Sequence, residues 1–116
     1  MPIIYAKDVE RTERFPGIFR WERVSKERGA QGMIMGELDF TPGSSMRPHT
    51  HPNEEAMLIM EGTLEAVLGD ETCTVSAGDT VLAPAGVKHG FANRTSEHAR
   101  MVWVHPVSEI VMQWVD

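Results

Sequence analysis

The chain has few of the features that mark secreted or membrane-bound proteins. It has one cysteine, Cys73, which cannot form an internal disulfide, and a chain without disulfides is typical of a reducing compartment. Residues 1–15 lack the basic region and the apolar core of roughly 7 to 15 residues that form a signal peptide. No apolar run approaches the roughly 18 residues of a membrane span. We therefore expect a cytoplasmic protein.

Positive charge is also scarce. The 17 acidic residues outnumber the 11 basic ones, giving a formal net charge of −6, and the two signs are mixed along the chain. The sequence has no cluster of basic residues that could bind along a phosphate backbone, which argues against nucleic acid as a partner. With 41% hydrophobic and 24% charged residues among 116, the composition is that of one soluble globular domain, which we expect to span residues 1–116.

Helical periodicity is missing as well, since no segment of ten or more residues keeps it. Glycine and proline instead separate short segments rich in Val, Ile, Leu, Met, Phe and Trp, a pattern typical of an all-β fold. We expect Cys73 to be buried on one of these strands. Residues 1–12 and 107–116 show no clear pattern, and a short helix at either end is compatible with them. The expected strands are 18–24, 32–41, 46–51, 55–60, 63–68, 71–75, 80–83, 88–92 and 99–105, with Gly69 and Asp70 forming a hairpin turn.

Three chemically active side chains lie close together in residues 43–62, GSSMRPHTHPNEEAMLIMEG. His49 and His51 are two apart, so on a strand they project from the same face. Pro48 cannot donate to a sheet, which predicts an irregular or edge strand beside the histidines. Glu55 begins the next strand, and its spacing places Met57 and Ile59 on the same face as its own side chain.

A second cluster, residues 78–93, GDTVLAPAGVKHGFAN, contains a third histidine, His89. Together the two stretches resemble the paired motifs of the cupin superfamily, in particular its small single-domain members with a conserved barrel. All ten fixed positions of the two motifs are present. They are Gly43, His49, His51, Glu55, Gly62, Gly78, Pro84, Gly86, His89 and Asn93.

The resemblance implies an antiparallel, jelly-roll type β-barrel with one divalent transition metal per chain. Carried onto this sequence, its ligands are His49, His51, Glu55 and His89. Imidazole and carboxylate donors suit Fe, Mn, Ni, Zn, Co or Cu, and ligand type alone does not choose among these metals. Four protein ligands leave about two positions of an octahedral shell for water, dioxygen or a chelating substrate.

Strand periodicity also predicts what lines the interior. The expected lining is mostly apolar, which favours a small apolar, aromatic or enol-like substrate, although these side chains could equally be plain core. Arg47 shares the parity of the histidines and is either a carboxylate contact at the barrel mouth or an exposed strand-end residue. His105 is either a partner of the metal ligands or a structural residue. The candidate lining residues are Phe40, Arg47, Met57, Ile59, Phe91, Met101, Trp103 and His105.

Three functions are compatible with this sequence, and whether the protein is an enzyme stays open. The first is a metal-dependent oxygenase (a dioxygenase) on a small oxygen-chelating substrate, with Glu55 as a ligand that can also accept a proton. The second is a non-redox metalloenzyme, an isomerase, lyase or decarboxylase, acting on a keto, enol or sugar-derived compound. The third is a small-ligand binding or sensing module without turnover, because the cupin fold hosts all three.

The outward face of strand 55–60 is apolar too, with Ala56, Leu58 and Met60. A chain of this length has little material to cover such a face, and small cupins commonly pair. We therefore expect a homodimer with these residues at or beside the interface.

Overall fold

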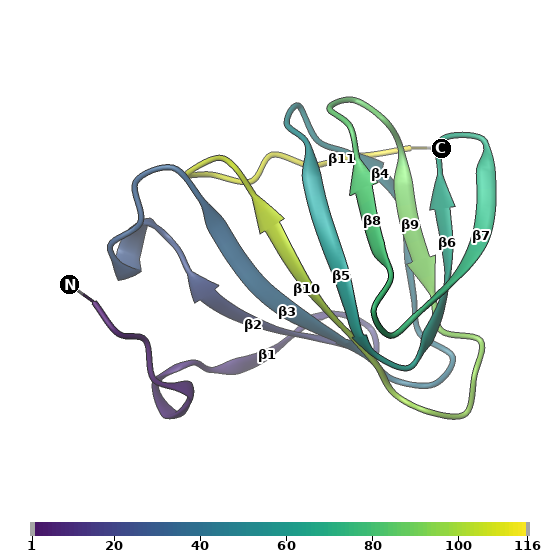
Figure 1. Ribbon diagram of the computed structural model, residues 1–116, viewed down its shortest axis with the longest axis horizontal. Helices are drawn as coiled ribbons and strands as arrows, with labels where there is room; N and C mark the ends of the chain where they lie inside the picture. Colours follow the sequence, from purple (N-terminus) through teal and green to yellow (C-terminus); the bar gives the residue numbers. More distant parts are fainter. Residues whose placement is uncertain (1, 116) are drawn as a thin grey trace.

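Two antiparallel β-sheets make up the computed structural model, which describes residues 2–115 (Figure 1). One sheet has six strands in the order β1-β2-β3-β10-β5-β8, and the other has five in the order β11-β4-β9-β6-β7. Two 3-10 turns, η1 (Ala6–Asp8) and η2 (Lys26–Arg28), complete the regular structure of this part of the chain. The strands are β1 (Arg11–Phe15), β2 (Ile18–Val24), β3 (Ile34–Phe40), β4 (Ser45–Thr50), β5 (Glu55–Glu61), β6 (Thr63–Leu68), β7 (Glu71–Ser76), β8 (Thr80–Ala83), β9 (His89–Ala92), β10 (Ala99–His105) and β11 (Gln113–Trp114).

The all-β jelly-roll prediction is confirmed, and the nine predicted strands lie within two residues of the observed ones. The two sheets are separate hydrogen-bonded units with free edges at β1, β8, β11 and β7, so the barrel is not closed by a continuous ladder. Two strands, β1 and β11, were not predicted. No helix among residues 2–115 is long and apolar enough to cross a membrane.

Alternation of side chains builds the core between the sheets. Along β10 the burial alternates strictly, and Met101, Trp103 and His105 all face inward. The strand β5 repeats the pattern, with Met57 and Ile59 buried while Leu58 and Met60 are 39% and 47% exposed. The prediction that alternate side chains of these two central strands face the core is therefore confirmed.

Cys73 is exposed, which corrects the prediction that it is buried. It lies on β7, the edge strand of the five-stranded sheet, where four of the six side chains are exposed. A strand that is paired on one side only and carries mostly polar residues does not bury a small side chain.

Gly36 in the middle of β3 serves the packing of the indole of Trp103. A Cβ at this position would meet the carbonyl of Trp21 and the ring of Trp103 within less than an ordinary contact distance. Since Gly36 is paired with Trp103 in the sheet register, its missing side chain lets the indole lie across the strand.

Candidate metal centre

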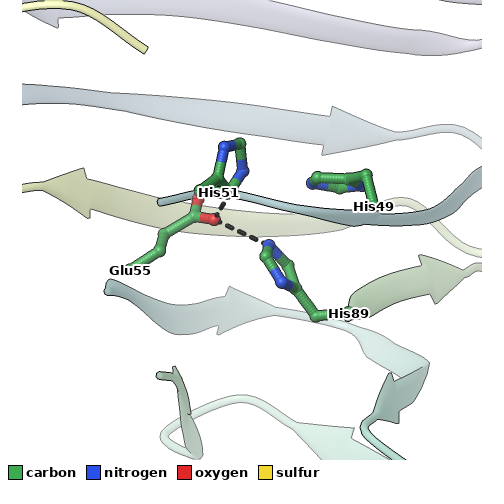
Figure 2. A group of neighbouring side chains, drawn as sticks. All are labelled: His49, His51, Glu55 and His89. Atoms are coloured by element: carbon green, nitrogen blue, oxygen red, sulfur yellow. Dashed lines mark hydrogen bonds and ion pairs between the residues drawn. The ribbon is translucent and has the colours of Figure 1, made fainter. Parts of the chain in front are cut away.

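Four donor side chains converge between the two sheets (Figure 2). His49 lies on β4 and His51 directly after it, Glu55 begins β5, and His89 begins β9. One ligand atom from each lies within 4.8 Å of the other three, and all four residues are buried, with exposures of 1% to 7%. The structure thus brings together the four residues that the cupin resemblance implies.

A bulge in β4 sets the direction of His49. The pairing of β4 with β9 joins Met46 to Phe91 and His49 to His89, so β4 carries one extra residue between these pairs. The extra residue at Arg47 and Pro48 breaks the period of two, as bulges do. Met46 and His49 consequently both face the interior.

Arg47 is displaced outward by the same bulge. It is exposed, and its guanidinium lies 4.9 Å from the ring centre of Trp114 on β11, the strand that pairs with β4. It does not line the cavity beside the histidines. Of the two alternatives for Arg47, the exposed residue is the one observed, because the irregularity that Pro48 predicted breaks the parity between Arg47 and His49.

Backbone carbonyls fix the tautomers of three histidines. His49 Nδ1 lies 2.9 Å from the carbonyl of Arg47, His51 Nδ1 2.7 Å from that of Val111, and His89 Nδ1 3.1 Å from that of Val87. A carbonyl oxygen only accepts, so each Nδ1 donates its proton and each Nε2 is left with a free lone pair. This arrangement is typical of metal-binding histidines.

Two of these lone pairs, those of His51 and His89, face one carboxylate oxygen. Glu55 Oε1 is 2.9 Å from His89 Nε2 and 3.4 Å from His51 Nε2. Two acceptors this close repel each other unless a cation or a proton lies between them. The donor set therefore fits a bound divalent metal better than it fits a network of neutral core residues.

In the metal-free centre the electrostatics favour an unprotonated His49 and an ionised Glu55, but they also favour a proton on His51. Burial, with the backbone contact of Arg47 opposing it, lowers the pKa of His49 to about 4, so its Nε2 is unprotonated at neutral pH. Burial acts to raise the pKa of Glu55, but the contacts with His105, His51 and His89 outweigh it and hold that pKa well below its usual range. For His51, burial is outweighed by the contacts with Glu55 and the Val111 carbonyl, and its pKa is raised.

A cavity of about 350 Å³ opens beside the donors. Ile34, Leu38 and Trp103 form an apolar wall from β3 and β10, and His105 lies at the inner end with His49, His51 and Glu55. Of the other predicted lining residues, Phe40, Met57, Ile59, Phe91 and Met101 are buried in the core and do not reach this space.

Two segments of the wall were not predicted. The first brings Arg14, Phe15 and Arg20 from β1 and β2, together with acidic residues, so the outer part of the cavity is charged rather than apolar. The Pro-Gly pair at 16–17 between these strands is a hairpin signal that could have identified β1. The second is the segment 108–112, for which the sequence carries no periodic signal.

Comparison with known proteins adds a family and several relatives. A family model described as Cupin domain matches residues 36–105. Polyketide synthase CurC of Streptomyces cyaneus is 31% identical over 102 residues, which are 87% of this chain and 66% of that protein. Protein SchB of Streptomyces halstedii is 30% identical over 87% of this chain and 74% of its own length. The chain spans only 32% of a rice germin-like protein to which it is 36% identical over 69 residues, 54% of this chain.

Two solved structures also superimpose on this chain. The polyketide cyclase RemF from Streptomyces resistomycificus superimposes with a TM-score of 0.87 at 27% identity, covering 100% of this chain and 86% of that one. An oxalate oxidase superimposes with a TM-score of 0.75 at 26% identity, covering 85% of this chain and 55% of that one.

Proposed function

Because this chain belongs to the cupin family, we propose that it is a non-redox metalloenzyme acting on a keto or enol substrate, in the manner of a polyketide cyclase. The observation that carries the proposal is the convergence of three imidazole Nε2 atoms and one carboxylate oxygen at the inner end of a cavity of about 350 Å³. The likeness to CurC and RemF, which extends over most or all of this chain, supports the choice of substrate class.

His49, His51, Glu55 and His89 would hold one divalent transition metal, whose identity the donor types leave open among Fe, Mn, Ni, Zn, Co and Cu. When bound, such an ion supplies Lewis-acid polarisation of the oxygens of a chelating 1,3-dicarbonyl compound. The strongly lowered pKa of Glu55 keeps its carboxylate ionised, which suits a ligand better than a proton acceptor.

The remaining residues of the cavity bind and orient the substrate. The apolar wall of Ile34, Leu38 and Trp103 packs against a carbon skeleton and excludes water from the donors. Arg14 and Arg20 line the outer part, where a carboxylate or phenolate end of the substrate would lie. A substrate with its dicarbonyl at the donors and an acidic group near these arginines would contact both ends of this set of lining residues.

Ring closure of such a substrate needs no oxidant. A carbon between two carbonyls loses a proton and forms a C–C bond to a third carbonyl carbon, whose oxygen takes up a proton. This bond closes the ring, and loss of the resulting hydroxyl with a neighbouring proton, as water, then forms a C=C bond within it. Atoms and electrons balance without dioxygen, which separates this chemistry from that of an oxygenase.

A metal-dependent oxygenase is the second candidate. Oxalate oxidase 2 of Hordeum vulgare is 35% identical to this chain, although the match covers 61% of the chain and 36% of that enzyme. The same three imidazoles and carboxylate would suit Fe or Mn in such chemistry. Because the oxidase matches only part of this chain, we place this function after the first.

The test uses protein loaded in turn with Zn, Ni, Mn or Fe and mixed with pentane-2,4-dione, a simple 1,3-diketone, with and without air. We expect an absorbance change from the chelated enolate and no uptake of dioxygen. A linear thioester with several 1,3-spaced carbonyls should then give a cyclic product lighter by one water per ring. The variant His51→Ala should lose both effects, while His98→Ala, which changes an exposed histidine, should retain them.

Two results would argue for other functions, and a third would overturn the role of the metal. Stoichiometric dioxygen uptake with the diketone supports the oxygenase. Binding without any product from the thioester supports a sensing module. Product at the same rate and with the same regiochemistry in metal-free protein overturns the role of the metal.

A further inference from the structure

His105 contacts the candidate metal centre through the carboxylate of Glu55, and its ring lies beside that of His51, with 4.7 Å between the ring centres. It ends β10, is 3% exposed, and its Nε2 lies 3.1 Å from Oε2 of Glu55. The other carboxylate oxygen, Oε1, is the one that faces His51 and His89. Glu55 thus divides its two oxygens, one toward the candidate metal position and one toward His105.

The tautomer of His105 follows from Asn53. The Asn53 amide nitrogen lies 2.8 Å from the carbonyl oxygen of Glu54, an atom that only accepts, so the side-chain amide is oriented with its NH₂ group there. The same nitrogen lies 3.0 Å from His105 Nδ1. His105 Nδ1 therefore accepts, and the proton of a neutral His105 is on Nε2, directed at Glu55.

This is the reverse of the pattern at the three candidate ligands. Their Nδ1 atoms face carbonyl oxygens and carry the proton, which frees Nε2 for a metal. Residues 2–115 thus contain four buried histidines of two kinds. Three have a carbonyl beside Nδ1 and can offer the lone pair of Nε2 to a metal, whereas His105 has an amide N–H beside Nδ1 and donates a hydrogen bond from Nε2.

From this geometry we infer that His105 is a positioning residue: held by Asn53, it donates Nε2–H to Glu55 Oε2 and so leaves a single carboxylate oxygen to bind the metal. A carboxylate held in this way binds through one oxygen and does not occupy a second metal position. The positions that a chelating substrate needs then stay open. The inference rests on the proposed metal site but not on the proposed reaction.

The first test reads the tautomers directly by two-bond ¹H–¹⁵N NMR correlations in metal-free and zinc-loaded protein. We expect His105 to carry its proton on Nε2 in both forms. In the zinc form His49, His51 and His89 should show Nδ1–H with Nε2 bound to zinc. A zinc-bound Nε2 on His105, or a proton on its Nδ1, would overturn the inference. If the proposed metal site is wrong and zinc does not bind, the metal-free spectrum still tests the tautomer.

The second test separates positioning from packing. His105→Gln places an amide N–H near the position of Nε2, whereas His105→Phe keeps the ring volume without a donor. We expect zinc affinity of the Gln variant to stay within about threefold of the wild type and that of the Phe variant to fall by roughly 10- to 100-fold, the usual effect of losing such a partner. X-ray absorption of the zinc-loaded Phe variant should show a higher coordination number from a two-oxygen carboxylate.

Asn53→Ala provides a variant that leaves the core untouched, since Asn53 is a partly exposed loop residue. Without the amide donor, His105 should populate both tautomers, and zinc affinity should fall in proportion to the loss of the Nε2–H form. Equal losses in the Gln and Phe variants would show that His105 is only a packing residue. An unchanged tautomer in Asn53→Ala would overturn the part of the inference in which Asn53 holds His105.

Discussion

Gly90 controls the distance between two of the candidate ligands without carrying a donor atom itself. It follows His89 on β9, where β9 pairs with the bulged segment of β4. A Cβ built on Gly90 would lie 2.8 Å from the carbonyl oxygen of Met46 and 3.0 Å from the nitrogen of Pro48. Both neighbours are backbone atoms, so no side chain can rotate to relieve the overlap.

The variant Gly90→Ala should therefore move β4 away from β9. Ordinary contact begins near 3.4 Å, so the carbonyl of Met46 must retreat by about 0.6 Å (3.4 − 2.8). Metal–ligand distances tolerate shifts of only about 0.2 Å, and His49 and His89 are joined by this same strand pair. We expect the zinc affinity to fall at least about tenfold and the free energy of unfolding of the metal-free protein to fall by about 1 to 3 kcal/mol, the usual cost of overpacking.

The assay is competition for zinc against a chromophoric chelator, combined with urea unfolding of the metal-free protein. Gly32→Ala is the matched control, because a Cβ at Gly32 meets nothing within 4 Å and the residue has no positive φ. That variant should bind zinc like the wild type and be unchanged or slightly more stable. If Gly90→Ala binds zinc as tightly as Gly32→Ala does, the spacing of β4 and β9 does not set the ligand geometry and the reasoning fails.

Three further predictions concern the ligands, pH and assembly. Elemental analysis should find one transition metal per chain in the wild type and in His98→Ala, and little in His49→Ala or His51→Ala; unchanged metal content in the latter two would exclude them as ligands. In metal-free protein, NMR should find His49 titrating near pH 4, below its ordinary 6.5. The unfolded chain then gains this proton first, so the contribution of His49 to the free energy of unfolding falls by about 3 kcal/mol as pH drops from 6.5 to 4, and metal affinity falls with it. A His49 that titrates near 6.5 contradicts this. Light scattering should find a dimer for the wild type and monomer or insoluble protein for Leu58→Asp, because Leu58, Met60 and Leu82 are 39%, 47% and 54% exposed on β5 and β8; a monomeric wild type would refute the assignment.

Local patterns were enough to predict the central strands. In β5 and β10 the alternation of apolar residues reports directly on burial, because each strand is paired on both sides and packs inward on one face. The resemblance to the two cupin motifs likewise implied four ligands that the fold brings within 4.8 Å of one another. The alternation of apolar residues in a strand and the spacing of residues in a motif both involve positions close together in the chain. They can therefore be recognised in a single sequence.

The parts that failed depend on irregular geometry and on distant segments. The alternation of faces gave Arg47 the same face as the histidines, but a bulge adds one residue to β4 between Met46 and His49. Alternation holds only in a regular strand, so it fails on either side of the bulge. The strand β11 has two residues, too few to show any period, and it exists because β4 offers it a free edge. Asn53 is an ordinary loop residue by sequence, and only the contact with His105, 52 positions away, gives it a role.

The contact between His51 and Val111 has a consequence for the order in which the protein can mature. The Nδ1 proton of His51 is held by a carbonyl 60 residues further along the chain, and β11 beside it pairs with His49 and Thr50. While β4, β5 and β9 are formed but residues 111–114 have not yet docked on β4, His51 has no fixed tautomer. We therefore expect such a folding intermediate to hold metal weakly, and stable loading to follow the docking of this segment.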